Sequence, residues 1–309
     1  MADRYSAALE MAEWADSNGA AAVVLSEHHG SDDGYLPSAL TMAAAVAART
    51  SRLAIVVSAI AAPFCDPLRL AEEAMVVDAL SGGRLAVVLA NGYVPSEFEM
   101  FGVDIGERVR RTIEAVEVLR LARTGEPFEY RGRTVRITPA PDGRGPTVLM
   151  GGSGPAAARR AARIADGFQP SNGDAWDVYR SERIALGKRD PGEYLPEPTG
   201  FLHVAHDPDA AWERVAPHAL HEANAYGRWA AEGNMAGTTG YEAADDADAL
   251  RASGRYRVLT PTELVAEVHT APTVPVVLSP MMGGLPPTLA WESLRLVETD
   301  VLPELARTS

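Results

Sequence analysis

Three consecutive segments decide the fold: LAIVVSAI at residues 53–60, PLRLAEEAMVVDAL at 67–80 and LAVVLA at 85–90. The first and third are short, continuous apolar runs, which are typical of strands buried on both faces of a parallel sheet. The middle segment has the length and composition of a helix. A strand, a helix and a second strand in this order predict a parallel βαβ unit.

The same alternation continues in both directions along the chain. Further helices are predicted at residues 3–17, 37–49, 107–124, 155–165, 176–186 and 288–302, with a helix pair interrupted at Pro217 over 208–231. Further strands are predicted at 20–26, 147–150, 167–170, 199–205 and, last, 274–278, and a small hairpin at 128–138. This α/β pattern predicts a TIM (β/α)8 barrel whose first strand is missing, because the chain begins directly with a helix.

No low-complexity tail or charge block divides the chain, so a single domain over residues 1–309 is expected. Residues 233–255 are rich in Gly, Ala and Asp and contain almost no large apolar side chains. Such a segment buries too little apolar surface to offset its ordering entropy, which predicts a mobile excursion. Since loops between late barrel strands lie at the active face, we expect a lid here.

Composition excludes several classes of protein. The formal net charge of −14 at pH 7 disfavours nucleic-acid binding, and the arginine clusters at 108–111 and 159–163 are expected to be solvated helix faces. Cys65 is the single cysteine, which excludes an intrachain disulfide. No signal peptide and no apolar run of ~20 residues is found, so a cytoplasmic protein without a membrane segment is expected.

Six motifs cover nearly the whole chain: LSEHH (25–29), DPLRLAEE (66–73), DALSGGRL (78–85), NGYVPSEFEMFGVD (91–104), GGSGPAAARRAARIADG (151–167) and GGLPPTLAWESLRL (283–296). In this order they resemble a known family, the bacterial luciferase-like flavin-dependent monooxygenases, which include deazaflavin-dependent relatives. The resemblance implies a luciferase-like TIM barrel that opens with a strand of roughly ten residues, lining the substrate cavity, before the helix at 3–17. That strand is not present in the sequence.

Two adjacent histidines, His28 and His29, follow the strand at 20–26. Barrel enzymes place their chemistry where a parallel strand ends, and imidazole can pass a proton near neutral pH. The resemblance implies that His28 is the active-site histidine beside the reactive edge of the flavin. A structural role is expected for His29.

A glycine-rich turn, Gly151-Gly152-Ser153-Gly154, joins the strand at 147–150 to the next helix. Exposed amides, a hydroxyl and the positive end of the helix dipole form a seat for a phosphate, which the resemblance assigns to the flavin. The family commonly has an arginine where this chain has Asn91, so weak flavin affinity is expected. Alternatively, Asn91 only holds the turn before Gly92.

The remaining site residues come from neighbouring loops. Tyr93 covers the cofactor or substrate, or simply packs the loop. The resemblance places a non-proline cis peptide bond at Ser58-Ala59, under the flavin ring. We expect five residues to converge on one cavity at the carboxyl ends of the strands: His28, Ser58, Asn91, Ser153 and the pocket residue Met281.

Two histidine pairs, His203 with His206 and His218 with His221, have no carboxylate or thiolate partner at ligand spacing. They are expected to be surface histidines, and no metal is expected. A G-x-S-x-G nucleophile elbow is also missing from the sequence.

The resemblance and these residues together predict a monooxygenase that uses reduced FMN and oxygen to oxidise a small organic substrate. Because no nicotinamide fingerprint is recognisable, a separate flavin reductase is expected as a partner. Two alternatives stay open: an oxidoreductase using the 5-deazaflavin coenzyme on the same fold, and a non-catalytic flavin-binding homologue. Members of the family commonly dimerise through helices of the second and third βα units, so the resemblance implies a homodimer.

Overall fold

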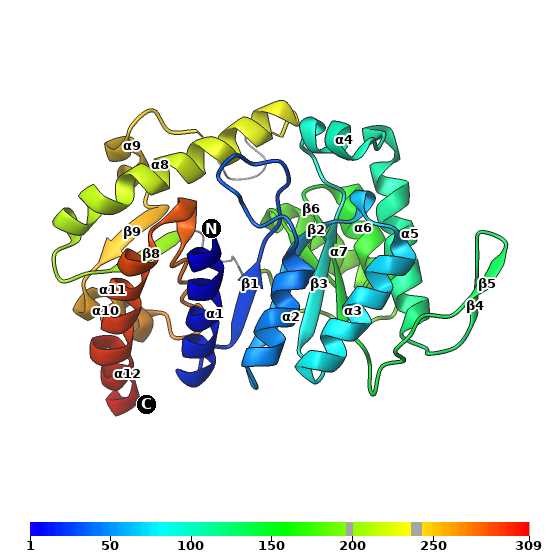
Figure 1. The fold of residues 1–309 in the computed structure, drawn as a ribbon, viewed down its shortest axis with the longest axis horizontal. Coiled ribbons are helices and arrows are strands. Elements are labelled where there is room, and N and C mark those ends of the chain that lie inside the picture. Colours follow the sequence, from blue (N-terminus) through cyan, green and yellow to red (C-terminus); the bar gives the residue numbers. More distant parts are fainter. Residues whose placement is uncertain (196–199, 236–242, 309) are drawn as a thin grey trace. The chain divides into compact units, whose positions relative to one another are not determined.

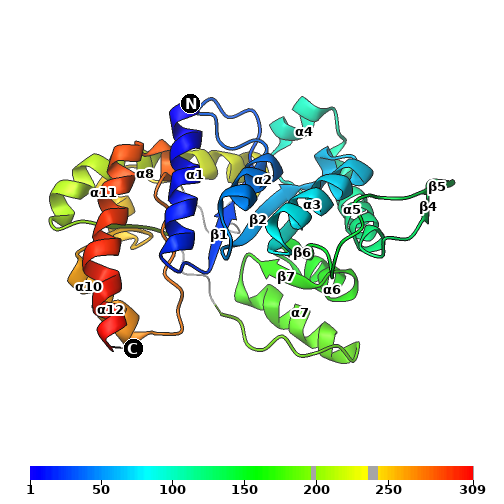
Figure 2. The same ribbon diagram turned by 60° about the horizontal axis from the view of Figure 1, so that its bottom comes forward.

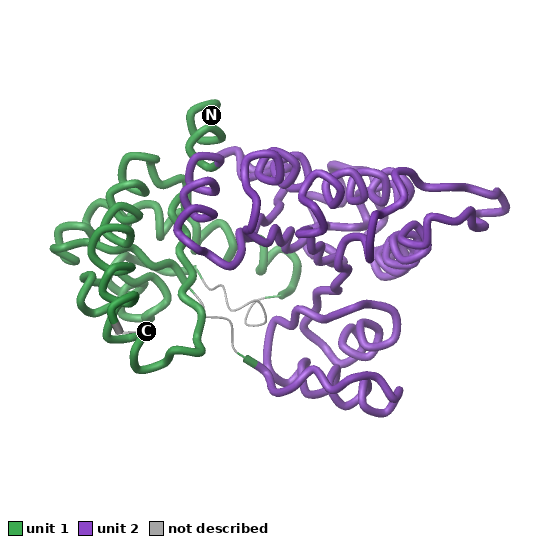
Figure 3. Tube along the Cα trace, turned by 90° about the horizontal axis from the view of Figure 1, so that it is seen from below, with its two compact units in different colours: residues 1–8, 195–309 green, residues 9–194 purple. Residues whose placement is uncertain are grey.

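The computed structural model describes residues 1–195, 200–235 and 243–308 (Figure 1). The chain divides into two compact units (Figure 3). The larger unit contains residues 9–194, and the smaller unit contains residues 1–8 and 195–309. The single-domain expectation stays a prediction.

The larger unit contains most of the predicted βα repeats. Every helix and strand predicted from the sequence up to residue 186 is present, with ends that differ by a few residues. The elements are α1 (Ala2–Ser17, of which residues 2–8 group with the smaller unit), β1 (Ala22–Leu25), α2 (Ala39–Arg49), β2 (Ala54–Ala61), η1 (Ala62–Phe64), α3 (Pro67–Ser81), β3 (Leu85–Ala90), α4 (Pro95–Phe101), η2 (Ile105–Glu107), α5 (Arg108–Ala122), β4 (Phe128–Tyr130), β5 (Arg133–Val135), β6 (Thr147–Gly152), α6 (Pro155–Ile164), β7 (Gly167–Pro170) and α7 (Gly173–Ala185).

The five strands of the main sheet run parallel in the order β1-β2-β3-β6-β7, which is also their order in the chain. Parallel crossovers are right-handed, so strands added always on one side place their helices on one face of the sheet. Figure 2 shows α2 and α3 side by side along the strands, and α6 packs against β6 and β7. Because successive side chains of a strand point to opposite faces, every second side chain of each strand lies on the face away from these helices.

Local sequence explains where α3 begins and ends. The Asp66 side chain accepts hydrogen bonds from the backbone N–H groups of Leu68 and Arg69, and Pro67 occupies the first helical position. The helix ends at Gly82, whose φ of 68° lies in the left-handed region that glycine adopts without steric cost. These signals fix the crossover between β2 and β3.

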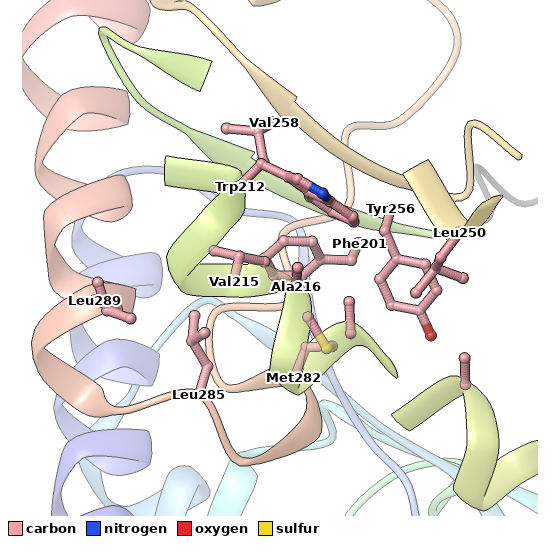
Figure 4. Packing of buried hydrophobic residues seen from close by; sticks show 12 residues of the cluster. Phe201, Trp212, Val215, Ala216, Leu250, Tyr256, Val258, Met282, Leu285 and Leu289 are labelled. Atoms are coloured by element: carbon pink, nitrogen blue, oxygen red, sulfur yellow. The ribbon is translucent and has the colours of Figure 1, made fainter. Parts of the chain in front are cut away.

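The smaller unit is built on two parallel strands and the helices that pack on them. Its core includes Phe201, Trp212, Tyr256 and Leu285 (Figure 4). The elements are β8 (Phe201–Val204), α8 (Pro208–Glu232), α9 (Ala247–Ala252), β9 (Tyr256–Leu259), α10 (Pro261–Thr270), η3 (Met282–Gly284), α11 (Pro287–Leu296), the π-helical turn η4 (Val297–Val301) and α12 (Leu302–Thr308).

The predicted helix interruption at Pro217 is wrong, because α8 is one helix of 25 residues that contains Pro217. A proline inside a helix removes one backbone hydrogen bond and costs about 3 kcal/mol. On either side of it, α8 buries Trp212, Val215 and Ala219 in the core of the smaller unit. Burial of one large apolar side chain contributes about 1.5–3 kcal/mol, so tertiary packing outweighs the local break.

The predicted last strand at 274–278 is also wrong. This segment has no strand pairing in the described part of the chain, and Val274, Val276 and Val277 are exposed. The partner of β8 is β9 instead. Part of the predicted excursion at 233–255 forms α9, in which Leu250 is buried, while residues 236–242 lie outside the described residues.

Candidate active site

The predicted site residues of the larger unit lie at the carboxyl-terminal edge of its parallel sheet. His28 follows β1, Ser58 lies near the end of β2, Asn91 follows β3, and residues 151–154 end β6 and lead into α6. The strand register pairs the end of β2 with the end of β3, and the end of β6 with the end of β7. Met281 belongs to the smaller unit, so its convergence with the other residues stays a prediction.

His28 is buried and hydrogen-bonded to a buried carboxylate. Its Nδ1 lies 2.9 Å from Glu97 Oε1, and the same oxygen accepts a hydrogen bond from the His29 backbone N–H at 2.9 Å. An ionised carboxylate can only accept hydrogen bonds, so Nδ1 carries the proton. In the neutral ring Nε2 is then the basic nitrogen, which is the arrangement a proton-exchanging histidine needs.

Two tyrosines surround the His28 ring. Tyr35 lies edge-on at 5.2 Å between ring centroids, and Tyr93 lies edge-on at 6.1 Å. The Tyr35 hydroxyl is 2.6 Å from Ser26 Oγ, which joins the segment before His28 to the loop that follows it. The structure therefore brings two predicted site residues, His28 and Tyr93, into contact.

His29 has the surroundings of a structural residue. Its ring lies edge-on to Phe101, with centroids 4.8 Å apart, and its Nε2 is 3.3 Å from Glu27 Oε1 at an angle outside hydrogen-bond geometry. Glu27 also accepts a hydrogen bond from the Ala39 backbone N–H at 3.3 Å.

Burial, together with nearby Glu27, raises the pKa of Cys65 to about 12, so this thiol stays protonated.

The peptide bond between Ser58 and Ala59 is cis, as the resemblance implies. Ser58 Oγ donates a hydrogen bond of 2.9 Å to Gln169 Oε1 on β7. β3 and β6 separate these two strands, which in a flat sheet would place them about 14 Å apart. Two such side chains are too short for that span, so the sheet curves strongly and both residues face its concave side.

The glycine-rich turn has features that suit an anion. Gly154 is the N-cap of α6 and provides no side-chain cap for the amides of the first turn. A Cβ on Gly152 would lie 2.5 Å from the Ala157 Cβ, so the turn approaches the helix closely. Asn172 Nδ2 donates to the Ser153 carbonyl at 3.2 Å and holds the turn from α7.

Asn91 presents a buried acceptor without a partner. Its Oδ1 makes no hydrogen bond to the described residues. An unsatisfied buried polar atom costs about 1–3 kcal/mol, so it commonly marks a place where a ligand or water binds. Together with the uncapped α6 terminus and the concave sheet, this atom fits a polar cofactor that carries a phosphate.

Two residues of this site were missing from the sequence-based prediction. Glu97 lies on α4, a helix that was not predicted although Pro95 at its first position is a helix-start signal. Gln169 lies within the predicted strand β7, but nothing in a single sequence indicates that it reaches Ser58. The sequence therefore contained a signal for the helix that carries Glu97, but none for the contact between Gln169 and Ser58.

The histidine pairs lie in the smaller unit. His203 is buried in β8, so its prediction as a surface residue is wrong, and burial lowers its pKa to about 4. In the described ranges, no group of three or more His, Cys, Asp or Glu residues could hold a metal ion. No described helix is both long enough and apolar enough to cross a bilayer.

Residues 1–270 match the family model described as luciferase-like monooxygenase. The chain is 32% identical over 118 residues to the 4-hydroxyprotoasukamycin monooxygenase of Streptomyces nodosus subsp. asukaensis, covering 38% of this chain and 32% of that protein. It is 31% identical over 146 residues to the FMNH2-dependent dimethylsulfone monooxygenase of Pseudomonas fluorescens, covering 45% and 39%.

Another relative, the F420-dependent glucose-6-phosphate dehydrogenase of Nocardia farcinica, is 29% identical over 180 residues, with 50% of this chain and 53% of that protein covered. The first curated relatives are thus matched over about a third to about half of their length. The crystal structure of the monooxygenase RslO1 from Streptomyces bottropensis superposes with a TM-score of 0.74 at 25% identity, covering 97% of this chain and 93% of that one. This likeness confirms the predicted luciferase-like barrel class, and the family model shows that the chain belongs to the luciferase-like monooxygenase family.

Proposed function

We propose that this chain is a flavin-dependent monooxygenase that uses reduced FMN and oxygen to oxidise a small organic substrate. The observation that carries the proposal is the buried His28–Glu97 pair, at the same sheet edge as the uncapped N-terminus of α6. A proton-exchanging group and an anion seat at one edge are what a phosphate-bearing redox cofactor requires. The FMNH2-dependent relative supports the choice of cofactor.

The residues divide into those that hold the cofactor and those that handle protons. The amides of residues 151–154 and the Ser153 hydroxyl would bind the phosphate, and Asn91 Oδ1 would accept a hydrogen bond from a cofactor N–H or O–H. The flavin, when bound, supplies the electrons that reduce oxygen. The concave sheet face with Ser58 and Ala59 would support its ring, and Tyr93 would line the substrate pocket.

His28 moves the protons in this proposal. Glu97 fixes Nδ1 as the donor toward the carboxylate, so Nε2 is the nitrogen that exchanges a proton with the reacting molecules. The buried Glu97 carboxylate, 2.9 Å from Nδ1, also holds the ring in one orientation. Tyr93 limits the access of water to the ring.

A deazaflavin-dependent oxidoreductase is the second candidate. The match to the F420-dependent relative covers half of this chain, and the uncharged Asn91 gives no preference for FMN. Such an enzyme would use the same phosphate seat and His28 without oxygen. A separate flavin reductase is a further part of the FMN proposal, since the chain has no recognisable nicotinamide fingerprint. The homodimer that the family resemblance implies is also part of it.

Fluorescence titration of the purified protein with reduced FMN under anaerobic conditions, and with the 5-deazaflavin coenzyme, decides between the candidates. We expect saturable binding of reduced FMN. The complex is then mixed with oxygenated buffer, and flavin reoxidation is followed in wild type and in His28→Asn. A positioned proton donor contributes about 10²–10⁴-fold, so we expect a rate change of at least tenfold.

His206→Asn is the matched control, because the His206 side chain is 71% exposed and should leave the rate unchanged. Binding of the deazaflavin alone would reject FMN in favour of the second candidate. Binding of neither cofactor rejects both, and tight flavin binding with equal reoxidation rates in wild type and His28→Asn would support a non-catalytic flavin-binding homologue.

A further inference from the structure

A second cationic site lies at the opposite edge of the larger unit's sheet. A surface cavity of about 290 Å³ is lined by the carboxyl-terminal ends of α5 and α6, the segment that enters β7, and the end of α7 with the loop after it. These segments meet at the amino-terminal ends of the strands, whereas His28 and the glycine-rich turn lie at the carboxyl-terminal ends. The lining residues are Arg120, Arg123, Arg163, Ile164, Ala165, Asp166, Arg183 and Lys188.

Positive charge dominates this cavity although the whole chain carries −14. Five basic side chains line it against one carboxylate, Asp166, and Glu182 pairs with Arg163 at its rim. The three helix ends each add roughly −0.5 of a charge. After this compensation an excess of between one and two positive charges remains, which is close to the charge of −1.5 to −2 on a phosphate monoester at pH 7.

Three of the basic groups are held in place by the fold. Arg123 forms a bidentate ion pair with Asp166, in which Nη1 donates to Oδ2 at 2.5 Å and Nη2 donates to Oδ1 at 3.1 Å. Lys188 Nζ donates to the carbonyls of Ala162 and Arg163 at the end of α6, at 2.7 and 2.9 Å. Arg183 donates to the Asp166 carbonyl at 3.3 Å. The cavity wall is therefore pre-organised.

Arg120 is different from these three. It is exposed on the last turn of α5 and has no hydrogen bond or ion pair to the residues that the structure describes. Among the described residues, the Arg163 guanidinium pairs with the rim carboxylate of Glu182 alone. Burial, together with the positive charges of Arg183 and Arg120, lowers the pKa of Lys188, so the cations are close enough to repel one another. A bound anion would relieve this repulsion.

We propose that this cavity binds a phosphate group, either free or as a phosphate monoester, through the guanidinium groups of Arg120 and Arg163. Arginine guanidinium groups make paired, charge-assisted hydrogen bonds to phosphate oxygens. The site is separate from the flavin phosphate seat, because the two lie at opposite ends of the strands.

Isothermal titration calorimetry at constant ionic strength tests the proposal, with inorganic phosphate and glycerol phosphate as probes. We expect saturable phosphate binding that weakens about tenfold in Arg120→Gln and in Arg163→Gln, the effect of losing one charge-assisted hydrogen bond. Arg159→Gln is the matched control. Arg159 lies on α6, as Arg163 does, and its guanidinium is 4.0 Å from the carboxylate of Glu182, but it does not line the cavity.

Loss of affinity in Arg120→Gln and Arg163→Gln, with Arg159→Gln unchanged, supports the site. Absence of saturable binding, full affinity in Arg120→Gln, or an equal loss in Arg159→Gln overturns it, the last because diffuse surface charge would then explain the binding. Tighter binding of glycerol phosphate than of phosphate would identify a phosphorylated organic ligand. Equal binding would identify free phosphate.

Discussion

Replacing Gly152 with alanine tests how the glycine-rich turn packs against α6. The added Cβ would lie 2.5 Å from the Ala157 Cβ and 3.6 Å from a ring carbon of Phe168. Carbon atoms in contact prefer about 3.5–4.0 Å, so the turn and the helix must separate by about 1 Å. Both neighbouring atoms belong to packed elements, and Ala157 has no alternative rotamer that would relieve the contact.

Overpacking of this size costs about 1–3 kcal/mol. In a unit of this size each kcal/mol lowers the thermal midpoint by about 2–4 °C, so the Gly152→Ala midpoint should fall by several degrees. The shift also moves residues 151–154, whose amides form the proposed phosphate seat. We therefore expect weaker binding of reduced FMN, by about tenfold if one hydrogen bond to the phosphate is lost.

Gly154→Ala is the matched comparison, because a Cβ at Gly154 meets no atom within 4 Å and its φ of −129° suits any residue. Thermal unfolding followed by circular dichroism measures both variants beside wild type. We expect a lower midpoint for Gly152→Ala and an unchanged midpoint for Gly154→Ala. Equal midpoints in all three proteins would refute the close packing of the turn on α6.

Substitutions at three further residues test separate features. Burial alone would raise the pKa of Asp16, but the N–H groups of Arg52, Leu53 and Ser51 lower it to about 2, so Asp16→Asn should cost about 2 kcal/mol at pH 7. In urea unfolding this difference should shrink by about half at pH 3, since the contribution is lost as pH falls from about 4 toward 2; a pH-independent difference would contradict it. Asn91→Arg should tighten reduced-FMN binding by about 1–3 kcal/mol in a fluorescence titration, and unchanged affinity would show that another group holds the phosphate. Glu97→Ala leaves two donors unsatisfied and should destabilise the protein by about 2–4 kcal/mol in urea, whereas Glu97→Gln, whose single oxygen can accept both bonds, should cost less than half of that.

Sequence patterns predicted the larger unit well because its signals are local. Short apolar runs bounded by capping residues and glycines locate β2, α3 and β3 without knowledge of the rest of the chain. The smaller unit was predicted less well. The strand β9 was missed, although Thr260 and Glu263 after it form a capping box that marks the start of α10. The composition of residues 274–278 favoured a strand there instead, but a strand also needs a neighbouring strand to pair with.

The candidate site shows a second limit, which concerns distance along the chain. His28 and Glu97 are 69 residues apart, and their hydrogen bond depends on the loop after β1 meeting the helix after β3. Parallel order predicts that both lie at the same sheet edge, but it does not predict a contact. The resemblance predicts His28 as a site residue from its motif, while its hydrogen-bond partner Glu97 was found only in the structure.

The Ser58–Gln169 hydrogen bond depends on the shape of the whole sheet. Strand order alone puts β2 and β7 three strand spacings apart, and only the curvature accumulated across β3 and β6 brings the two side chains to 2.9 Å. That curvature arises from strand twist and from the helices covering one face, to which each element contributes a little. Residues that meet across a curved sheet therefore leave no local pattern, and the concave face that would receive a cofactor ring is a property of the assembled strands.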